Sequence, residues 1–387
     1  MIVLFVALAQ SVLALELTTG TYAEAKAKAA ELNKPLLLEF YADWWGTCKR
    51  FAGAVNSDKD IQKAVDGIVL FRLNSEKGEG KTIAKEFTVK FLPTFAMVNT
   101  SGARIDRWLG YDKSQFLGNL ASATSDLATI DEKLARFQAK PDAKTAAALG
   151  RYSAGMVQYK DAVTYYTKAQ ELNSDSTMDY TFYIFQNMAD GVGAKDFTYD
   201  DARAAANTYL ASPTKTNKQT NYIYGIMIQL AKSNNRKEDL AKYLQDGLDF
   251  TAKGDDPDMK KEHADIMVDY AIYVKKDTAA AVVYKKAAMP EGWITNSDNL
   301  NEFAWWCFTI KANLSEAEQL SRKAIELAKP GKGRSNIYDT LAEIVNAEGN
   351  PKEAAEVSKK AAADDPDSKY FPKQVTRFEE LAKGNIK

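Results

Sequence analysis

The chain has 387 residues, which is long enough for two or three domains with their own hydrophobic cores. Its 51 lysines and arginines nearly cancel its 52 aspartates and glutamates, so the chain lacks the basic surplus with which a nucleic-acid binder neutralises phosphates. Two cysteines, Cys48 and Cys307, and a single histidine leave no set of ligands for a Cys/His zinc site and no disulfide framework. We therefore expect no nucleic-acid partner, no metal site and no cofactor.

The first fifteen residues are almost wholly apolar. This run is shorter than the about 20 residues that a membrane span needs, but it suits the core of a signal peptide, and Val12-Leu13-Ala14 fits a signal peptidase. No lysine or arginine precedes the run, and a buried first strand is the alternative. We expect a signal peptide at residues 1–15, an exported protein that is periplasmic or secreted, and no membrane span once the signal is removed.

From residue 16 to residue 125, apolar runs alternate with amphipathic stretches. The pattern predicts helices at 21–33, 46–65, 81–87 and from residue 112 onward. It predicts strands at 35–41, 68–73, 94–98 and 104–108, the last two joined by a turn at 99–102. Such alternation indicates an α/β domain with a mixed central sheet.

From residue 126 to residue 387 the strand signal vanishes and an alanine-rich helical periodicity replaces it. Ala280, Ala317 and Ala354 lie 37 residues apart, and small residues recur in the same register elsewhere. Small residues at fixed spacing let the two helices of a hairpin approach closely. The pattern resembles a tetratricopeptide-repeat array, whose period is about 34 residues. We expect an all-α solenoid of about five or six hairpins with helix 373–383 as a cap; an irregular helical domain is the alternative.

The predicted strand at 35–41 runs directly into Ala42-Asp43-Trp44-Trp45-Gly46-Thr47-Cys48-Lys49. This stretch resembles the signature of the thioredoxin superfamily, Ala-x-Trp-Cys-Gly-x-Cys-Lys. Downstream, Phe91-Leu92-Pro93-Thr94 is similar to the family's cis-proline segment, and Gly110 corresponds to its glycine after the last strand. The resemblance covers about residues 17–125 and implies a thioredoxin-like fold for the domain at 16–125.

The chain departs from this family at one position. Trp45 stands where the family carries its attacking cysteine, and Cys48 occupies the position of the resolving cysteine. The attacking thiol needs the exposed helix start, where the helix dipole stabilises a thiolate, whereas Cys48 is expected to be buried one turn further on. Dithiol exchange through an intramolecular disulfide is therefore not available at this motif. Cys307 lies in an aromatic helix of the array, and we interpret it as a small core residue.

The resemblance also assigns roles to other residues. Glu39 corresponds to the family's buried acid beneath the resolving cysteine, so Cys48 and Glu39 are the candidate, vestigial catalytic residues. Alternatively, Glu39 faces a water-filled pocket or pairs with a lysine. Trp44, Trp45, Leu92 and Pro93 are candidate peptide-binding residues, because family members add an extended peptide beside the cis-proline. The alternative is that both tryptophans fill the hollow that a substrate occupies in relatives.

Two functions remain open at this point. The first is a protein- or peptide-binding module, chaperone-like or adaptor-like, that has lost its attacking thiol and uses the helical array to hold polypeptide clients. The second is a residual thiol-disulfide oxidoreductase that works through the lone thiol of Cys48. We favour binding, because loss of the attacking thiolate removes the central chemical step.

Overall fold

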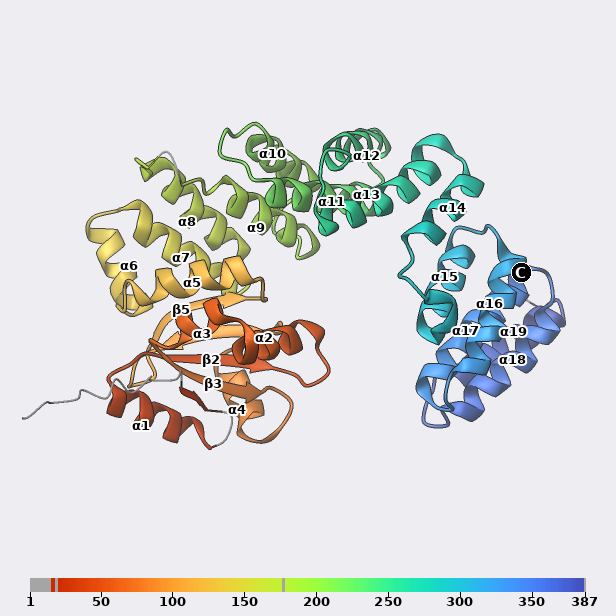
Figure 1. Ribbon diagram of the computed structural model, residues 1–387, viewed down its shortest axis with the longest axis horizontal. Helices are drawn as coiled ribbons and strands as arrows, with labels where there is room; N and C mark the ends of the chain where they lie inside the picture. Colours follow the sequence, from red (N-terminus) through yellow and green to blue (C-terminus); the bar gives the residue numbers. More distant parts are fainter. Residues whose placement is uncertain (1–14, 18–19, 176–177, 386–387) are drawn as a thin grey trace, which may run out of the picture. The chain divides into compact units, whose positions relative to one another are not determined.

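The computed structural model describes residues 15–17, 20–175 and 178–385 of the chain (Figure 1). Residues 1–14, which hold nearly all of the predicted signal peptide, lie outside the described residues, whereas Leu15 is the first residue of strand β1. The chain divides into two compact units, residues 1–216 and residues 217–387, and each is described by itself.

The first unit begins with an α/β domain. Its strands are β1 (Leu15–Leu17), β2 (Leu36–Tyr41), β3 (Val69–Asn74), β4 (Thr94–Val98) and β5 (Arg104–Leu109). Its helices are α1 (Tyr22–Leu32), α2 (Gly46–Ser57), α3 (Lys59–Val65), α4 (Gly78–Glu86) and α5 (Lys113–Thr124). The strands form one sheet in the order β1-β3-β2-β4-β5, in which β1, β3 and β2 are parallel and β4 runs antiparallel to both β2 and β5. The predicted mixed sheet is confirmed.

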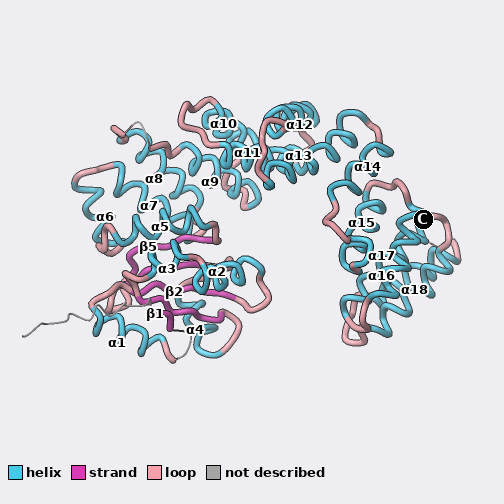
Figure 2. The backbone as a smooth tube through the Cα atoms, in the orientation of Figure 1, coloured by secondary structure: helices cyan, strands magenta, loops and turns pink. Residues whose placement is uncertain are grey.

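Helices cover both faces of this sheet, and Figure 2 shows the magenta strands between them. On one face, Ala25 of α1 and Ile83 of α4 join a cluster of buried residues from β2, β3 and β4. On the other face, Phe51 of α2, Ile61 of α3 and Phe116 of α5 pack on the opposite side chains of the same strands. Burial on both faces explains why β2 reads as an almost continuous apolar run.

The predicted helix at 46–65 is wrong in one respect, because the structure has two helices there. Asp58 takes an extended backbone conformation, with φ −92° and ψ 114°, and separates α2 from α3. Its carboxylate accepts hydrogen bonds from the backbone N–H groups of Asp60 and Ile61 at the start of α3. Aspartate is a strong N-cap residue, and here that preference overrides the helical periodicity on either side.

Five helices complete the first unit. They are α6 (Ile130–Ala139), α7 (Ala143–Gly155), α8 (Tyr159–Leu172), α9 (Thr181–Gly193) and α10 (Tyr199–Leu210). Helix α7 pairs with α8, and α9 pairs with α10. Gly150 allows the close approach within the first pair, since a Cβ atom at this position would lie only 3.0 Å from the ring of Tyr166. The small residues of the repeat pattern therefore lie where two helices meet.

The second unit is helical throughout its described length. Its elements are α11 (Asn217–Ser233), α12 (Lys237–Thr251), α13 (Pro257–Tyr270), the π-helical turn η1 (Ala271–Lys275), α14 (Thr278–Ala288), the 3-10 turn η2 (Trp293–Thr295), α15 (Ser297–Thr309), α16 (Leu314–Leu327), α17 (Lys332–Ala347), α18 (Pro351–Asp364) and α19 (Phe371–Ala382). Successive helices from α11 to α18 pair into hairpins. Ala317 and Ala354 are fully buried, in agreement with the repeat pattern. Helix α19 packs against α18 at the position of the predicted cap.

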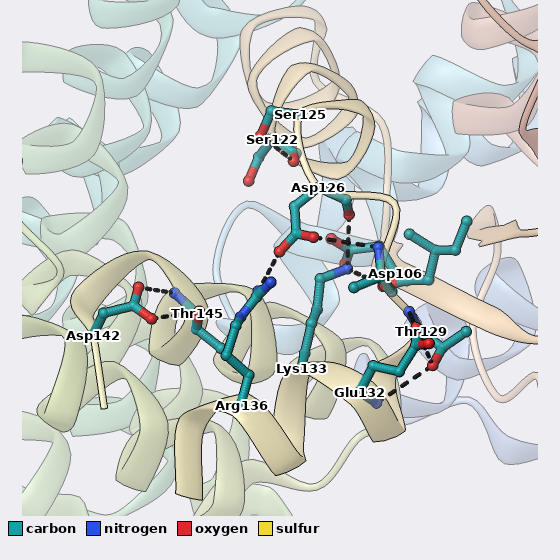
Figure 3. Close-up of polar contacts among 12 residues, drawn as sticks. Asp106, Ser122, Ser125, Asp126, Thr129, Glu132, Lys133, Arg136, Asp142 and Thr145 are labelled. Carbon is teal, nitrogen blue, oxygen red and sulfur yellow. Dashed lines mark hydrogen bonds and ion pairs between the residues drawn. The ribbon is translucent and has the colours of Figure 1, made fainter. Parts of the chain in front are cut away.

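The edge of the sheet at β5 is covered by α6 and α7. The buried ammonium group of Lys133 on α6 donates hydrogen bonds to the carbonyl oxygens of Ile105 on β5 (2.8 Å), Asp126 (3.0 Å) and Ala128 (2.7 Å). Figure 3 shows Lys133 with its contact to Asp126. An exposed edge strand is a template for aggregation, and the first helices of the array remove that exposure here.

Two arginines also make contacts at this edge. Arg107 of β5 donates from Nε to the carbonyl oxygen of Gly155 at the end of α7, at 2.6 Å, and also bonds the carbonyl of Phe87. Asp106 of β5 forms an ion pair with Arg151 of α7, with 2.5 Å between Oδ2 and Nη2. Together with the contacts of Lys133, these contacts hold α6 and α7 against the sheet. The boundary between the two compact units accordingly lies further along the chain, after residue 216. The predicted domain limits of 16–125 and 126–387 stay a prediction.

None of the helices within the described residues has both the length and the apolar character that crossing a membrane requires.

Candidate functional site

Four loops meet at one end of the sheet. Tyr41, the last residue of β2, lies beside Asn74, the last residue of parallel β3. Thr94, the first residue of antiparallel β4, lies beside Leu109 at the end of β5. Thr94 also pairs with Phe40, the residue of β2 that precedes Tyr41. The segments that follow β2, β3 and β5 and the segment that precedes β4 therefore emerge together. All the sequence-predicted site residues lie at this end of the domain, apart from Glu39 inside β2.

The two tryptophans stand exposed at the start of α2. Trp45 is the N-cap residue and Trp44 precedes it, with 42% and 62% of their surfaces exposed. Their rings pack edge to face with 5.4 Å between centroids, and the indole N–H of Trp44 donates to Glu76 Oε1 at 3.1 Å. The tryptophans therefore do not fill a hollow in the domain; they present aromatic surface to solvent.

The peptide bond between Leu92 and Pro93 is cis, as predicted. The carbonyl oxygen of Pro93 accepts a hydrogen bond from the N–H of Gly110 at 2.8 Å. The side chain of Leu92 is half-buried and packs against the cluster of buried residues that α1 and α4 form with the sheet. Within the described residues, neither the backbone N–H nor the C=O of Leu92 takes part in a hydrogen bond. Next to it, Phe91 is exposed, and the sequence reasoning did not single out this aromatic residue.

Cys48 lies one turn into α2 and is only 1% exposed. Burial raises the pKa of its thiol above the usual value, and the negative charge of Glu39 raises it further. Cys307 is buried in α15, and burial raises its pKa to about 11. Both thiols are free. The expected burial of the two cysteines is confirmed, and neither environment favours a thiolate at neutral pH.

Glu39 is fully buried in β2 and forms an ion pair with Arg72 on the neighbouring strand β3. The guanidinium of Arg72 also lies 4.7 Å from the centre of the Tyr41 ring. The cation paired with Glu39 is therefore an arginine, whereas a lysine partner was one of the alternatives that the sequence left open. Sequence reasoning missed Arg72 because it lies 33 residues away, although its place in an apolar strand was a usable signal.

A polar rim joins the loops after β2 and β3. Asp43 accepts hydrogen bonds from Lys77 Nζ at 2.6 Å and from Asn74 Nδ2 at 3.0 Å. The hydrogen bond from Lys77 lowers the pKa of the Asp43 carboxyl, so the pair is charged at neutral pH. In the part of the chain that the structure describes, no group of three or more His, Cys, Asp or Glu side chains is placed to hold a metal ion.

The raised thiol pKa leads to a testable expectation about Cys48. In a Cys307→Ala variant, a thiol reagent at pH 7 should modify folded Cys48 much more slowly than the same thiol in guanidinium chloride. Burial blocks access, and the raised pKa lowers the thiolate fraction below that of an ordinary cysteine, so the rate should climb as the pH rises. Rapid modification of the folded protein at pH 7 would show that Cys48 is a reactive monothiol.

Residues 17–100 match the family model described as thioredoxin-like. The strand order, the helices on both faces and the motif at the start of α2 agree with that match. The chain consists of a thioredoxin-like domain followed by an array of helical hairpins.

Comparison with individual proteins finds similarity to parts of the chain. The "Thiol:disulfide interchange protein DsbD" of Salmonella typhimurium is 37% identical over 79 residues, which are 20% of this chain and 14% of that protein. The chain thus matches only a small part of this relative. The C-terminal domain of DsbD from Neisseria meningitidis is 27% identical, with a TM-score of 0.22, covering 25% of this chain and 86% of that structure. A tetratricopeptide repeat protein from Parabacteroides merdae is 18% identical, with a TM-score of 0.38, covering 68% of this chain and 93% of that structure.

Proposed function

We propose that the chain is a polypeptide-binding protein, chaperone-like or adaptor-like, whose thioredoxin-like domain holds clients without dithiol exchange. The observation that carries this proposal is the contrast between two residues at the start of α2. An exposed tryptophan, Trp45, begins the helix where an attacking cysteine is needed, and the remaining thiol of Cys48 is buried behind it. The site thus offers aromatic contact surface, and the thiol of Cys48 is not exposed.

The proposed docking surface combines two kinds of contact. Trp44, Trp45 and Phe91 expose aromatic rings, and large aromatic side chains supply much of the binding energy at protein interfaces. Leu92 has a backbone N–H and C=O that no described residue uses, so an extended segment of a client can pair with them as a short strand. Backbone pairing recognises many sequences, which suits a chaperone-like or adaptor-like role.

Binding of a probe polypeptide tests this surface. Reduced and carboxymethylated lactalbumin stays unfolded and has no disulfide, so its affinity for the chain measures binding without redox chemistry. We expect the Trp45→Ala and Trp44→Ala variants each to weaken binding about tenfold or more, as is typical of buried aromatic hot spots.

A tryptophan of the helical array provides the matched control for this measurement. Trp305 on α15 is 42% exposed, as Trp45 is, and Trp305→Ala should leave the affinity for the probe unchanged. If Trp305→Ala weakens binding as much as Trp45→Ala does, the docking surface is not the end of the thioredoxin-like sheet. Catalysed reduction of insulin disulfides well above the dithiothreitol background would also overturn the binding proposal.

The second function is monothiol exchange through Cys48, with Glu39 as a proton carrier. The observation in its favour is that Glu39 is fully buried in β2, and its negative charge raises the pKa of the Cys48 thiol. A single thiol can form a mixed disulfide with a substrate but has no second thiol in the motif to release it. The labelling experiment on Cys48 decides between the two functions.

We further propose that the protein is exported, as its apolar residues 1–15 suggest. The similarity to DsbD proteins, which are named for thiol-disulfide interchange, is compatible with an oxidising compartment outside the cytosol. N-terminal sequencing of the protein recovered from a periplasmic extract should find a mature chain that begins near residue 16. Recovery of the uncleaved chain from the cytosolic fraction alone would contradict export.

A further inference from the structure

Three cations beside the proposed docking surface have no acidic partner. Lys49, Arg50 and Lys90 are exposed, and none of them forms an ion pair within the described residues. The guanidinium of Arg50 donates a hydrogen bond to Thr47 Oγ1 at 3.1 Å, and this hydroxyl is neutral. The three positive charges are therefore available to a partner molecule.

The chain places these cations next to the aromatic rings of the docking surface. Lys49 follows Trp45 by one helical turn, and its backbone N–H donates to the Trp45 carbonyl oxygen at 3.1 Å. Residues four apart lie on the same face of a helix, so the Lys49 side chain lies beside that of Trp45. Lys90 directly precedes the exposed Phe91. A molecule that contacts the rings is thus within reach of the charges.

The two cations near the start of α2 oppose the charge preference of a helix. The start of a helix carries partial positive charge and favours acidic residues, whereas cations are favourable in the last turn. Helix α2 has no acidic residue in its first turn, and its N-cap residue, Trp45, supplies no side-chain acceptor for the backbone N–H groups there. Lys63, in contrast, lies in the last turn of α3. The helix dipole therefore gives Lys49 and Arg50 no stabilising role in α2.

The acidic groups near the docking surface are already engaged. Asp43 is paired with Lys77 at 2.6 Å. The carboxylate of Glu76 accepts a hydrogen bond from the indole N–H of Trp44. In the loop after β5, Asp112 accepts from a backbone N–H group at the start of α5. The charges that this surface leaves for a partner are therefore positive.

We propose that the docking surface selects extended polypeptide segments that carry carboxylate side chains, and that Lys49, Arg50 and Lys90 pair with aspartates or glutamates of the segment. This inference rests on the proposed function and adds the charge of the client to it. Backbone pairing at Leu92 is indifferent to side chains, so the cations supply selectivity. Complementary charge mainly speeds association and selects among partners, and salt screens it.

Titration of three synthetic peptides into the full chain tests the charge preference. The peptides are equal in length, share one apolar centre and carry aspartate, asparagine or lysine on both sides of it. At low salt, we expect the aspartate peptide to bind about fivefold tighter or more than the asparagine peptide, and the lysine peptide to bind most weakly. This preference should shrink at about 1 M sodium chloride, where the screening length is about 3 Å. Equal binding of the aspartate and asparagine peptides would overturn the inference.

Single substitutions locate the charges that matter. Lys49→Gln and Lys90→Gln should each weaken binding of the aspartate peptide about two- to fivefold and leave binding of the asparagine peptide unchanged. Lys63→Gln is the matched control, because it removes an exposed cation without an ion pair among the described residues, and that cation lies outside the docking surface. Equal weakening by Lys63→Gln would show that only the net charge of the protein matters, which would overturn the inference. Lys49→Gln should not lower the melting temperature, because the helix dipole does not favour this cation.

The lactalbumin probe separates a failure of this inference from a failure of the proposed function. If lactalbumin and the aspartate peptide both fail to bind, the proposed function fails and the inference fails with it. If lactalbumin binds and Trp45→Ala weakens that binding, while the three peptides bind equally, the proposed function stands and the charge preference is wrong. Trp45→Ala should weaken binding of the aspartate peptide as well. Unchanged binding would show that the carboxylates are recognised away from the tryptophans and would overturn the inference.

Discussion

Replacement of Asp106 by alanine is expected to lower the free energy of unfolding of the first compact unit by about 3–5 kcal/mol, because it leaves a buried charge without its partner. The Asp106 side chain is fully buried, and that of its partner Arg151 is 13% exposed. Apart from its two contacts with Asp106, the guanidinium of Arg151 also donates to Ser122 Oγ at 3.0 Å, a contact that does not neutralise its charge. The loss of stability should therefore affect β5 and α7 together.

Hydrogen exchange of the full chain, read peptide by peptide, measures this loss where it occurs. Protection should fall across β5 and α7 and should stay unchanged in the second compact unit. The matched control is Glu171→Ala, which removes the exposed pair between Lys168 and Glu171 on α8 and should cost less than about 1 kcal/mol. The paired change Asp106→Leu with Arg151→Met should recover part of the stability, because no unmatched guanidinium is left, although the buried ammonium of Lys133 still loses the attraction of Asp106. Equal effects of the Asp106 and Glu171 variants would contradict the buried role of the pair.

The second large effect is expected from Trp45→Cys, which places two cysteines two residues apart at the start of α2. A cysteine at the N-cap of α2 meets the positive end of the helix dipole and free backbone N–H groups. A thiol pKa lowered from about 8.5 to about 7 raises the thiolate fraction at pH 7 more than tenfold, to about one half. The variant should therefore form a disulfide with Cys48 under mild oxidation and should reduce insulin disulfides at a rate that the unmodified chain does not reach.

Trp44→Cys is the control for this gain. It introduces the same thiol one residue earlier, outside the motif spacing, and should neither form the disulfide with Cys48 nor gain the activity. The measurements are the mass change on alkylation before and after oxidation and the rate of insulin reduction. If Trp45→Cys cannot form the disulfide, the assignment of Trp45 to the position of the attacking cysteine is wrong.

Local patterns predicted much of the fold. The strands at 94–98 and 35–41 were predicted to within one residue, because each is a short apolar run between polar turns. The helical array was predicted from alanines that recur at one spacing, and Ala317 and Ala354 are buried where helices meet. The exposure of Trp45 and the burial of Cys48 followed from their places in the motif at the start of a helix.

Contacts between distant segments could not be predicted in the same way. Arg72 pairs with Glu39 because β3 lies beside β2, and the sequence spacing of the two residues carries no sign of this register. The break at Asp58 was missed because periodicity spans it, although its capping preference was visible. Arg107 of β5 donates to the carbonyl oxygen of Gly155 at the end of α7, 48 residues further along the chain, and no local pattern links these two segments.

The sequence by itself thus determined most of the succession of elements and the motif at the start of α2, because these depend on residues close together in the chain. Only the tertiary structure decided which charges meet. The pairing of Asp106 with Arg151 and that of Glu39 with Arg72 are both consequences of packing. The physical reason is that burial strengthens electrostatic interactions and penalises an unmatched charge, and burial depends on segments that the chain brings together only when it folds.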